Sequence, residues 1–131
     1  MTELTIQRES YWDLSDSLEL LAPTDVKRNR WVRFDAMNRL VLIAAREAEE
    51  VVALAVFVQR EALASGEGYF IAESHSGIID AAFVTECESI LQNIGMEKVV
   101  FTLPADSSHL ASLSRLHYAP DEVTLRKHLA N

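Results

Sequence analysis

The sequence predicts one α/β (α+β) domain over residues 1–131, in which a mixed central sheet of six to seven strands is covered by helices on both faces. Of the 131 residues, 49% are hydrophobic and 24% are charged, which is typical of a single globular domain. Two apolar runs, Leu40–Ala45 and Val51–Val58, lack polar alternation, so we expect both faces of the sheet to be covered. Residues Glu67 to Asn93 have the pattern of a strand, a turn of small residues and a long amphipathic helix.

The first part of the chain predicts a strand and two helices. Leu4–Gln7 has the pattern of a short strand, and Ser10–Leu21 that of a helix capped by its first residue. A second helix begins at Thr24 or Asp25, whose side chains can cap it, and ends near Met37.

The middle of the chain predicts three strands. Leu40–Ala45 and Val51–Val58 are joined by the acidic turn Glu47–Glu50, so they form an antiparallel hairpin. A further strand, Tyr69–Glu73, follows a segment punctuated by glycine.

A central helix is predicted from Ile78 to Ile94, where apolar residues recur at helical spacing. We expect Phe83 and Leu91 to face the sheet, and Gly95 suits the left-handed residue that ends such a helix. The chain then predicts a strand, a helix and a last strand: Lys98–Leu103, a segment from Asp106 or Ser107 to Leu116, and Val123–Leu129.

This order of elements, β-α-α-β-β-β-α-β-α-β, resembles the GCN5-related N-acetyltransferase (GNAT) superfamily over nearly the whole chain. The second half carries the likeness best, because Gly95 and the following EKVVFTLPADSSHLASLSRLHYAPDEVTLRKHL are similar to the family's strand, helix, corner and final strand. The resemblance implies an N-acyltransferase that moves an acetyl group from acetyl-CoA to an amine.

The resemblance also implies a cofactor site on the strand before the central helix and on the turn after it. In the family, the pantetheine pairs with the backbone of that strand, and the diphosphate lies on a turn of the form Arg/Gln-x-x-Gly-x-Gly/Ala. Carried over to this sequence, the cofactor-binding residues are Ile71, Ala72, Ser74, Ser76, Gly77, Ile78 and Ile79.

The turn departs from that form, because Gly77 alone matches it. Ser74 replaces the Arg or Gln, and the branched Ile79 obstructs the close backbone approach that Gly or Ala permits. Asp80 repels a diphosphate, and the sequence has no Lys or Arg between Arg60 and Lys98 to offset it.

Two residues are candidates for catalysis. Glu73, at the end of the predicted strand, suits a general base for the acceptor amine, or it is a solvated carboxylate. His75 can exchange a proton near neutral pH, or it is a structural residue of an exposed turn. The family's acid Tyr corresponds to Leu113, and we expect Tyr118 to pack at the corner.

The charges of the chain bear on its partners. Twelve basic and twenty acidic residues give a net charge of −8, which argues against nucleic acid as a partner. Basic residues nevertheless crowd Lys27–Arg39 around Trp31, which predicts a solvated helix face or a binding surface for an acidic protein or an anionic substrate. The partner-binding candidates are Lys27, Arg28, Arg30, Trp31 and Arg33.

The single cysteine and the spacing of the histidines bear on disulfides, location and metal binding. Cys87 is the single cysteine, so the chain has no internal disulfide, and we expect a cytoplasmic protein. No apolar run is long enough to span a membrane, and His109, His117 and His128 do not have the spacing of metal ligands.

Two hypotheses for function therefore stand. The first is an acetyl-CoA-dependent N-acetyltransferase. The second is a GNAT-fold binding protein that has lost the cofactor site, similar to some small proteins encoded by bacteriophages, in which case it is a virion component. A monomer or a homodimer is expected under either hypothesis.

Overall fold

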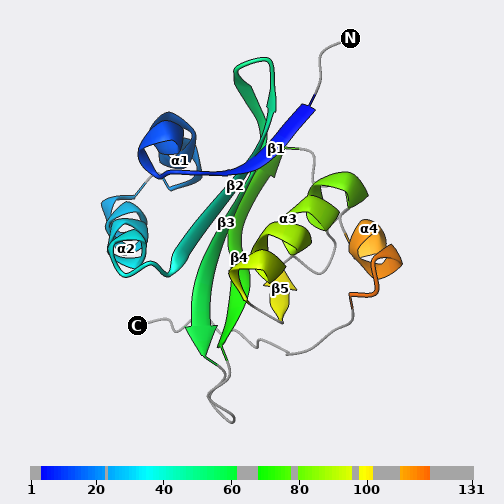
Figure 1. Ribbon diagram of the computed structural model, residues 1–131. Helices are drawn as coiled ribbons and strands as arrows, with labels where there is room; N and C mark the ends of the chain where they lie inside the picture. The colour runs from blue at the N-terminus through cyan, green and yellow to red at the C-terminus, as the bar shows by residue number, and fades with distance from the viewer. Residues whose placement is uncertain are drawn as a thin grey trace, which may run out of the picture.

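The computed structural model describes residues 4–22, 24–61, 68–77, 80–95, 98–101 and 110–118. In this part of the chain, a five-stranded sheet has the order β1-β2-β3-β4-β5 (Figure 1). Each neighbouring pair is antiparallel except β4 and β5, which are parallel. The strands are β1 (Leu4–Glu9), β2 (Leu40–Glu47), β3 (Glu50–Glu61), β4 (Gly68–Gly77) and β5 (Val99–Phe101). The helices are η1 (Trp12–Leu14), α1 (Ser15–Leu21), α2 (Asp25–Ala36), α3 (Ala81–Ile94) and α4 (Leu110–Arg115).

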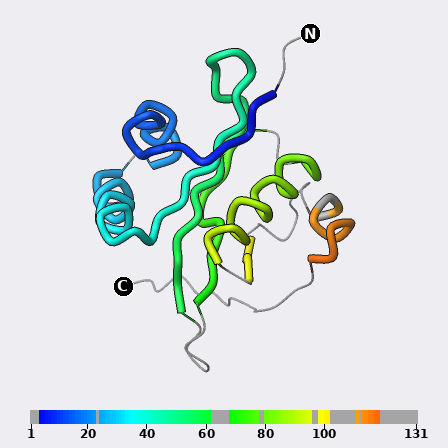
Figure 2. The backbone as a smooth tube through the Cα atoms, viewed as in Figure 1, coloured from blue at the N-terminus to red at the C-terminus, as the bar shows by residue number. Residues whose placement is uncertain are grey.

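Helices cover both faces of the sheet, as the apolar runs predicted. Figures 1 and 2 show α1 and α2 on one side of the strands and α3 and α4 on the other. Strand β2 divides its residues between two cores: Val41 and Ile43 pack with the α3 residues, whereas Leu40 and Leu42 pack with α1 and α2. The alternation of a buried strand thus builds a separate core on each face.

The structure corrects the predicted number of strands and two of the predicted boundaries. The sheet has five strands in the described residues rather than six to seven, and the predicted strand Val123–Leu129 lies outside them. Strand β4 continues to Gly77 rather than ending at Glu73. Helix α3 begins at Ala81 rather than Ile78, because the Asp80 side chain caps it by accepting a hydrogen bond from the Phe83 amide.

Other helix ends lie where the sequence predicted them. Thr24 caps α2 by accepting from the Lys27 amide, and Gly95 ends α3 in the left-handed region with φ of 102°. In the interior of α3, Phe83 and Leu91 are both buried against the sheet, as expected from their spacing.

Strand β4 contains a bulge at Glu73. Ser74 pairs with Val56 and Ala72 pairs with Phe57, so Glu73 is an additional residue without a counterpart in β3. A bulge places two neighbouring side chains toward one face, where a regular strand alternates them. The bulge therefore turns both Glu73 and Ser74 toward α2, whose side chains they contact.

Gly77 ends β4 at a place where no side chain fits, which gives a prediction for stability. Its φ is 79°, and a Cβ would lie 2.0 Å from the Val52 carbonyl oxygen. Gly95 also has a positive φ, but its Cβ would meet nothing within 4 Å. We expect Gly77→Ala to lose about 2–4 kcal/mol of unfolding free energy, from strain and overpacking together, and Gly95→Ala about 1 kcal/mol. Urea denaturation of both variants tests this, and equal losses would contradict it.

Candidate functional site

The candidate site centres on the Glu73 carboxylate, where α2, β3 and β4 meet. Its Oε1 pairs with the Arg30 guanidinium and accepts a hydrogen bond from Trp31 Nε1 at 3.3 Å. Arg60 on β3 brings Nη2 to 3.6 Å from Oε2, which is longer than a hydrogen bond. The Glu73 side chain is only 13% exposed. Its Oε2 is the single buried side-chain oxygen or nitrogen without a hydrogen-bond partner in the described part of the chain.

The residue next to Glu73 is bound to the same helix. Lys27 Nζ donates a hydrogen bond of 2.8 Å to Ser74 Oγ, and it lies 5.2 Å from the centre of the Trp31 ring. Trp31 itself is fully buried in the core between α2 and the sheet. The bulge on β4, one face of α2 and Arg60 of β3 thus bring three cationic groups and one carboxylate together.

This arrangement divides the predicted partner-binding residues. Lys27, Arg30 and Trp31 are directed at β4, and Trp31 has no exposed surface, because its ring packs beneath the helix. The prediction that the Trp31 ring meets a protein partner is therefore wrong for this structure. Arg28 instead pairs with Asp25 of α2 and, at 3.3 Å, with Glu19 of α1, while Arg33 is exposed.

The predicted cofactor residues Ile71, Ala72, Ser74, Ser76 and Gly77 all lie on β4, and Ile78 and Ile79 lie outside the described residues. Strand β5 pairs with β4 only as far as Ala72, which lies opposite Phe101. From Ser74 to Gly77, the described partner of β4 is β3.

The predicted turn at His75 is instead part of strand β4. His75 is half-buried and pairs with Ala55 of β3. Its neighbour Gly77 is required by the approach of the Val52 carbonyl. The turn expected from Ser74 to Ile79 is therefore strand as far as Gly77, because these residues continue the ladder with β3.

The N-terminus of α3 does not suit a diphosphate held in the family's manner. Asp80 Oδ1 accepts from the Phe83 amide at 2.9 Å, so a carboxylate occupies one of the N–H groups that could bind an anion. A negative charge there also repels a second one.

Tyr118 and Cys87, on the face of the sheet that α3 covers, are less suited to proton transfer than Glu73. The Tyr118 hydroxyl donates to Glu88 at 3.0 Å, and its ring packs edge-on against Phe101, as a corner residue was predicted to pack. Burial, and then the hydrogen bond to Glu88, raises the pKa of Tyr118. Burial likewise raises the pKa of Cys87 to about 12, so its thiol is protonated and inert at neutral pH.

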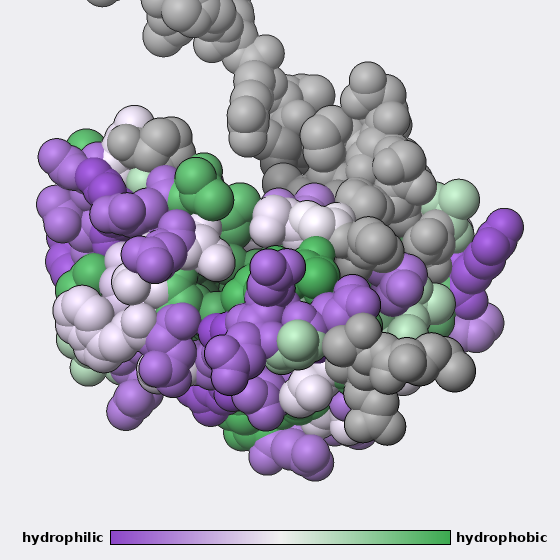
Figure 3. Space-filling model, turned by 90° about the horizontal axis from the view of Figure 1, so that it is seen from above, coloured by the Kyte–Doolittle hydropathy of each residue, from purple (hydrophilic) through white to green (hydrophobic). Residues whose placement is uncertain are grey.

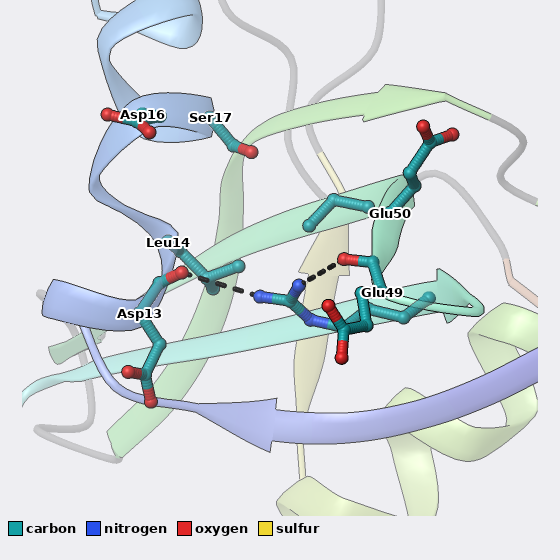
Figure 4. A pocket seen from close by; sticks show the side chains of 8 residues that line it. Asp13, Leu14, Asp16, Ser17, Glu49 and Glu50 are labelled. Atoms are coloured by element: carbon teal, nitrogen blue, oxygen red, sulfur yellow. Dashed lines mark hydrogen bonds between the residues drawn. The ribbon is translucent and has the colours of Figure 1, made fainter.

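A hollow of about 390 Å³ lies between η1, α1 and the β2–β3 turn (Figure 4). Arg46 donates there to the carbonyl oxygens of Glu49 at 2.6 Å and Asp13 at 3.4 Å. Arg46 also pairs with Glu9, whose side chain is 6% exposed, and the sequence did not indicate this contact between strands. Glu73 is not among the residues that line this hollow, and the ion pair of Arg46 with Glu9 joins β1 to β2.

Three further findings concern metal ions, membranes and the molecular surface. No group of three or more His, Cys, Asp or Glu side chains among them is arranged to hold a metal ion. Within the same ranges, no helix is long and apolar enough to cross a membrane. Seen from above in Figure 3, the surface is mainly hydrophilic, with smaller hydrophobic areas between.

Comparison with known proteins gives matches in structure only. No family model matches the sequence, and no curated protein matches it. An aminoglycoside acetyltransferase from an uncultured soil metagenomic sample has a TM-score of 0.70 and 13% identity, over 98% of this chain and 97% of that one. Glucosamine-6-phosphate N-acetyltransferase from Arabidopsis thaliana has a TM-score of 0.69 and 11% identity, over 98% and 99% of the two chains.

A ribosomal-protein-alanine N-acetyltransferase from Brucella melitensis is also similar, with a TM-score of 0.67 and 13% identity over 98% of this chain and all of that one. These likenesses extend over nearly the full length of both chains, although the sequences have diverged widely. The chain therefore has the GNAT fold.

Proposed function

We propose that this protein is an N-acetyltransferase that moves an acetyl group from acetyl-CoA to an amine, with Glu73 as the general base. The observation that carries the proposal is the Glu73 carboxylate, whose Oε2 is buried without a hydrogen bond. An unsatisfied buried oxygen costs stability, so such atoms call for an explanation outside stability. The fold shared with several acetyltransferases supports the same reaction class.

The chemistry assigned to Glu73 is a single proton transfer. An amine is protonated at neutral pH, and it becomes nucleophilic only when that proton leaves. Oε2 has the free lone pairs that take the proton, while Arg30 and Trp31 hold Oε1 in place. The proton ends on Glu73 and the lone pair stays on the amine nitrogen. Acetyl-CoA, when bound, would supply the acetyl group as an activated thioester, and its sulfur would leave as a thiolate that takes up the second proton lost by the amine.

The experiment that tests the proposal is a thermal-shift and calorimetric titration with acetyl-CoA. A ligand at 100 times its dissociation constant stabilises a protein by about 2.7 kcal/mol. We expect a melting shift that grows with acetyl-CoA concentration into the millimolar range. No shift at any concentration would contradict the proposal.

A variant of Asp80 makes this titration sharper. Because the Asp80 carboxylate lies at the α3 N-terminus, we expect Asp80→Asn to bind acetyl-CoA about tenfold more tightly, while an amide still caps the helix. Acetyl-pantetheine has no diphosphate and should bind both proteins equally. A gain for acetyl-pantetheine as large as for acetyl-CoA would show that Asp80 does not act through the phosphates.

A second candidate function is a GNAT-fold binding protein that does not use CoA. The observation that favours it is the same Asp80 cap, because it places a negative charge where the family's cofactor has its own. Under this function, acetyl-CoA would fail to stabilise both the wild type and Asp80→Asn.

A further inference from the structure

The charges around Glu73 do not balance. Lys27, Arg30 and Arg60 supply three positive charges, and Glu73 is the one carboxylate that pairs with either arginine among the described residues. The cluster therefore has two positive charges in excess, although the whole chain has a net charge of −8. Like charges gathered without a counter-ion repel one another, and such a surplus attracts an anion.

The two arginines also have unused capacity for hydrogen bonds. A guanidinium has five N–H donors, and it binds carboxylate or phosphate oxygens in pairs. The Arg30 and Arg60 side chains are 32% and 44% exposed, so part of each is open to a ligand. Arg60 is the looser of the two, because its Nη2 lies 3.6 Å from Glu73 Oε2.

We infer that Arg30 and Arg60, with Lys27 beside them, bind an anionic group on the amine that this protein acetylates. The acceptor is then a small amine with a carboxylate or a phosphate. This inference names the substrate class. It rests on the proposed function only in treating the bound amine as the acetyl acceptor. The binding itself needs no acetyl-CoA.

The same geometry links anion binding to the base. Arg60 lies over the buried Oε2 of Glu73. An anion that draws the Arg60 guanidinium toward itself uncovers that oxygen beside the incoming amine. Arg60 is in this sense a positioning residue, which controls access to Glu73 and does not touch the reacting nitrogen.

Calorimetry without acetyl-CoA tests the inference with three matched amines. Ethanolamine has no anionic group, whereas β-alanine has a carboxylate and 2-aminoethyl phosphate has a phosphate. We expect the better of the two anionic amines to bind at least tenfold more tightly than ethanolamine, and this preference to fall as salt is added. Whichever anionic amine binds better identifies the anion. Absent binding, or equal affinities for all three amines, would overturn the inference.

Three variants make the test specific. In Arg60→Gln, the preference for the anionic amine over ethanolamine should fall at least tenfold. Arg60→Lys should restore part of this preference, because the positive charge returns. Arg33→Gln is the control, because Arg33 is exposed on α2 and its replacement removes an equal charge. An equal loss in Arg33→Gln would show that only the overall charge matters, and would overturn the inference.

The outcomes also separate this inference from the proposed function. An anion preference without any acetyl transfer would retain the binding site and refute the enzyme. Acetyl transfer to ethanolamine as fast as to the anionic amines would retain the enzyme and refute the anion site.

Discussion

Replacing Glu73 by Gln should lower the rate of acetyl transfer by about 10²–10⁴-fold, the range of general base catalysis. The side chains have the same size, and the Gln carbonyl oxygen can still accept from Arg30 and Trp31. The amide cannot take a proton from the amine. We therefore expect the loss to fall on kcat at saturating acceptor, measured by release of the free thiol of CoA.

The matched control is Glu86→Gln, on the exposed side of α3. It removes the same charge and should retain the wild-type rate. A wild-type rate in Glu73→Gln, with an unchanged melting temperature, would show that Glu73 serves only to hold Arg30. A variant that unfolds would be replaced by Glu73→Asp, whose shortened carboxylate should retain some of the activity.

The largest expected loss of stability follows from truncating Phe83. This side chain is 1% exposed and lies in the core between α3 and the sheet. Phe83→Ala removes the whole buried ring and leaves a cavity, which costs about 3–5 kcal/mol. Leu91, fully buried on the same face, should lose about 2–5 kcal/mol when it is truncated in the same way.

Denaturant melts of these variants test the packing of α3. Ile94→Ala is the control, because Ile94 lies on the same helix and is 42% exposed. We expect it to lose less than about 1 kcal/mol, as surface substitutions generally do. Losses below about 0.5 kcal/mol for both Phe83→Ala and Leu91→Ala would mean that α3 does not pack on the sheet through this face.

The elements that the sequence predicted well depend on local signals. The Thr24 cap and the left-handed Gly95 need only a few neighbouring residues, and both lie where they were expected. The hairpin of β2 and β3 also has its expected place, because long apolar runs are typical of a sheet covered on both faces. Glu73 was named as a candidate base for its place at a strand end, and the structure corrects that place because β4 continues to Gly77.

The features that the sequence could not predict depend on distant contacts. The bulge at Glu73 follows from how β4 pairs with β3, and no local residue pattern requires it. Arg30 lies 43 positions from Glu73, so their pairing needs the folded sheet. Arg60 gave no signal of its own, since it reaches Glu73 from the neighbouring strand. The basic residues of α2 could be predicted as a group, but not which of them turn inward.

Mass spectrometry of small amines incubated with acetyl-CoA and the wild-type protein tests the proposed reaction most directly. The account predicts an acetyl group on the amine nitrogen of β-alanine or 2-aminoethyl phosphate, formed with one equivalent of free CoA thiol and absent without the protein. The account is contradicted if the folded wild type at millimolar acetyl-CoA forms no acetylated amine, whichever acceptor is used.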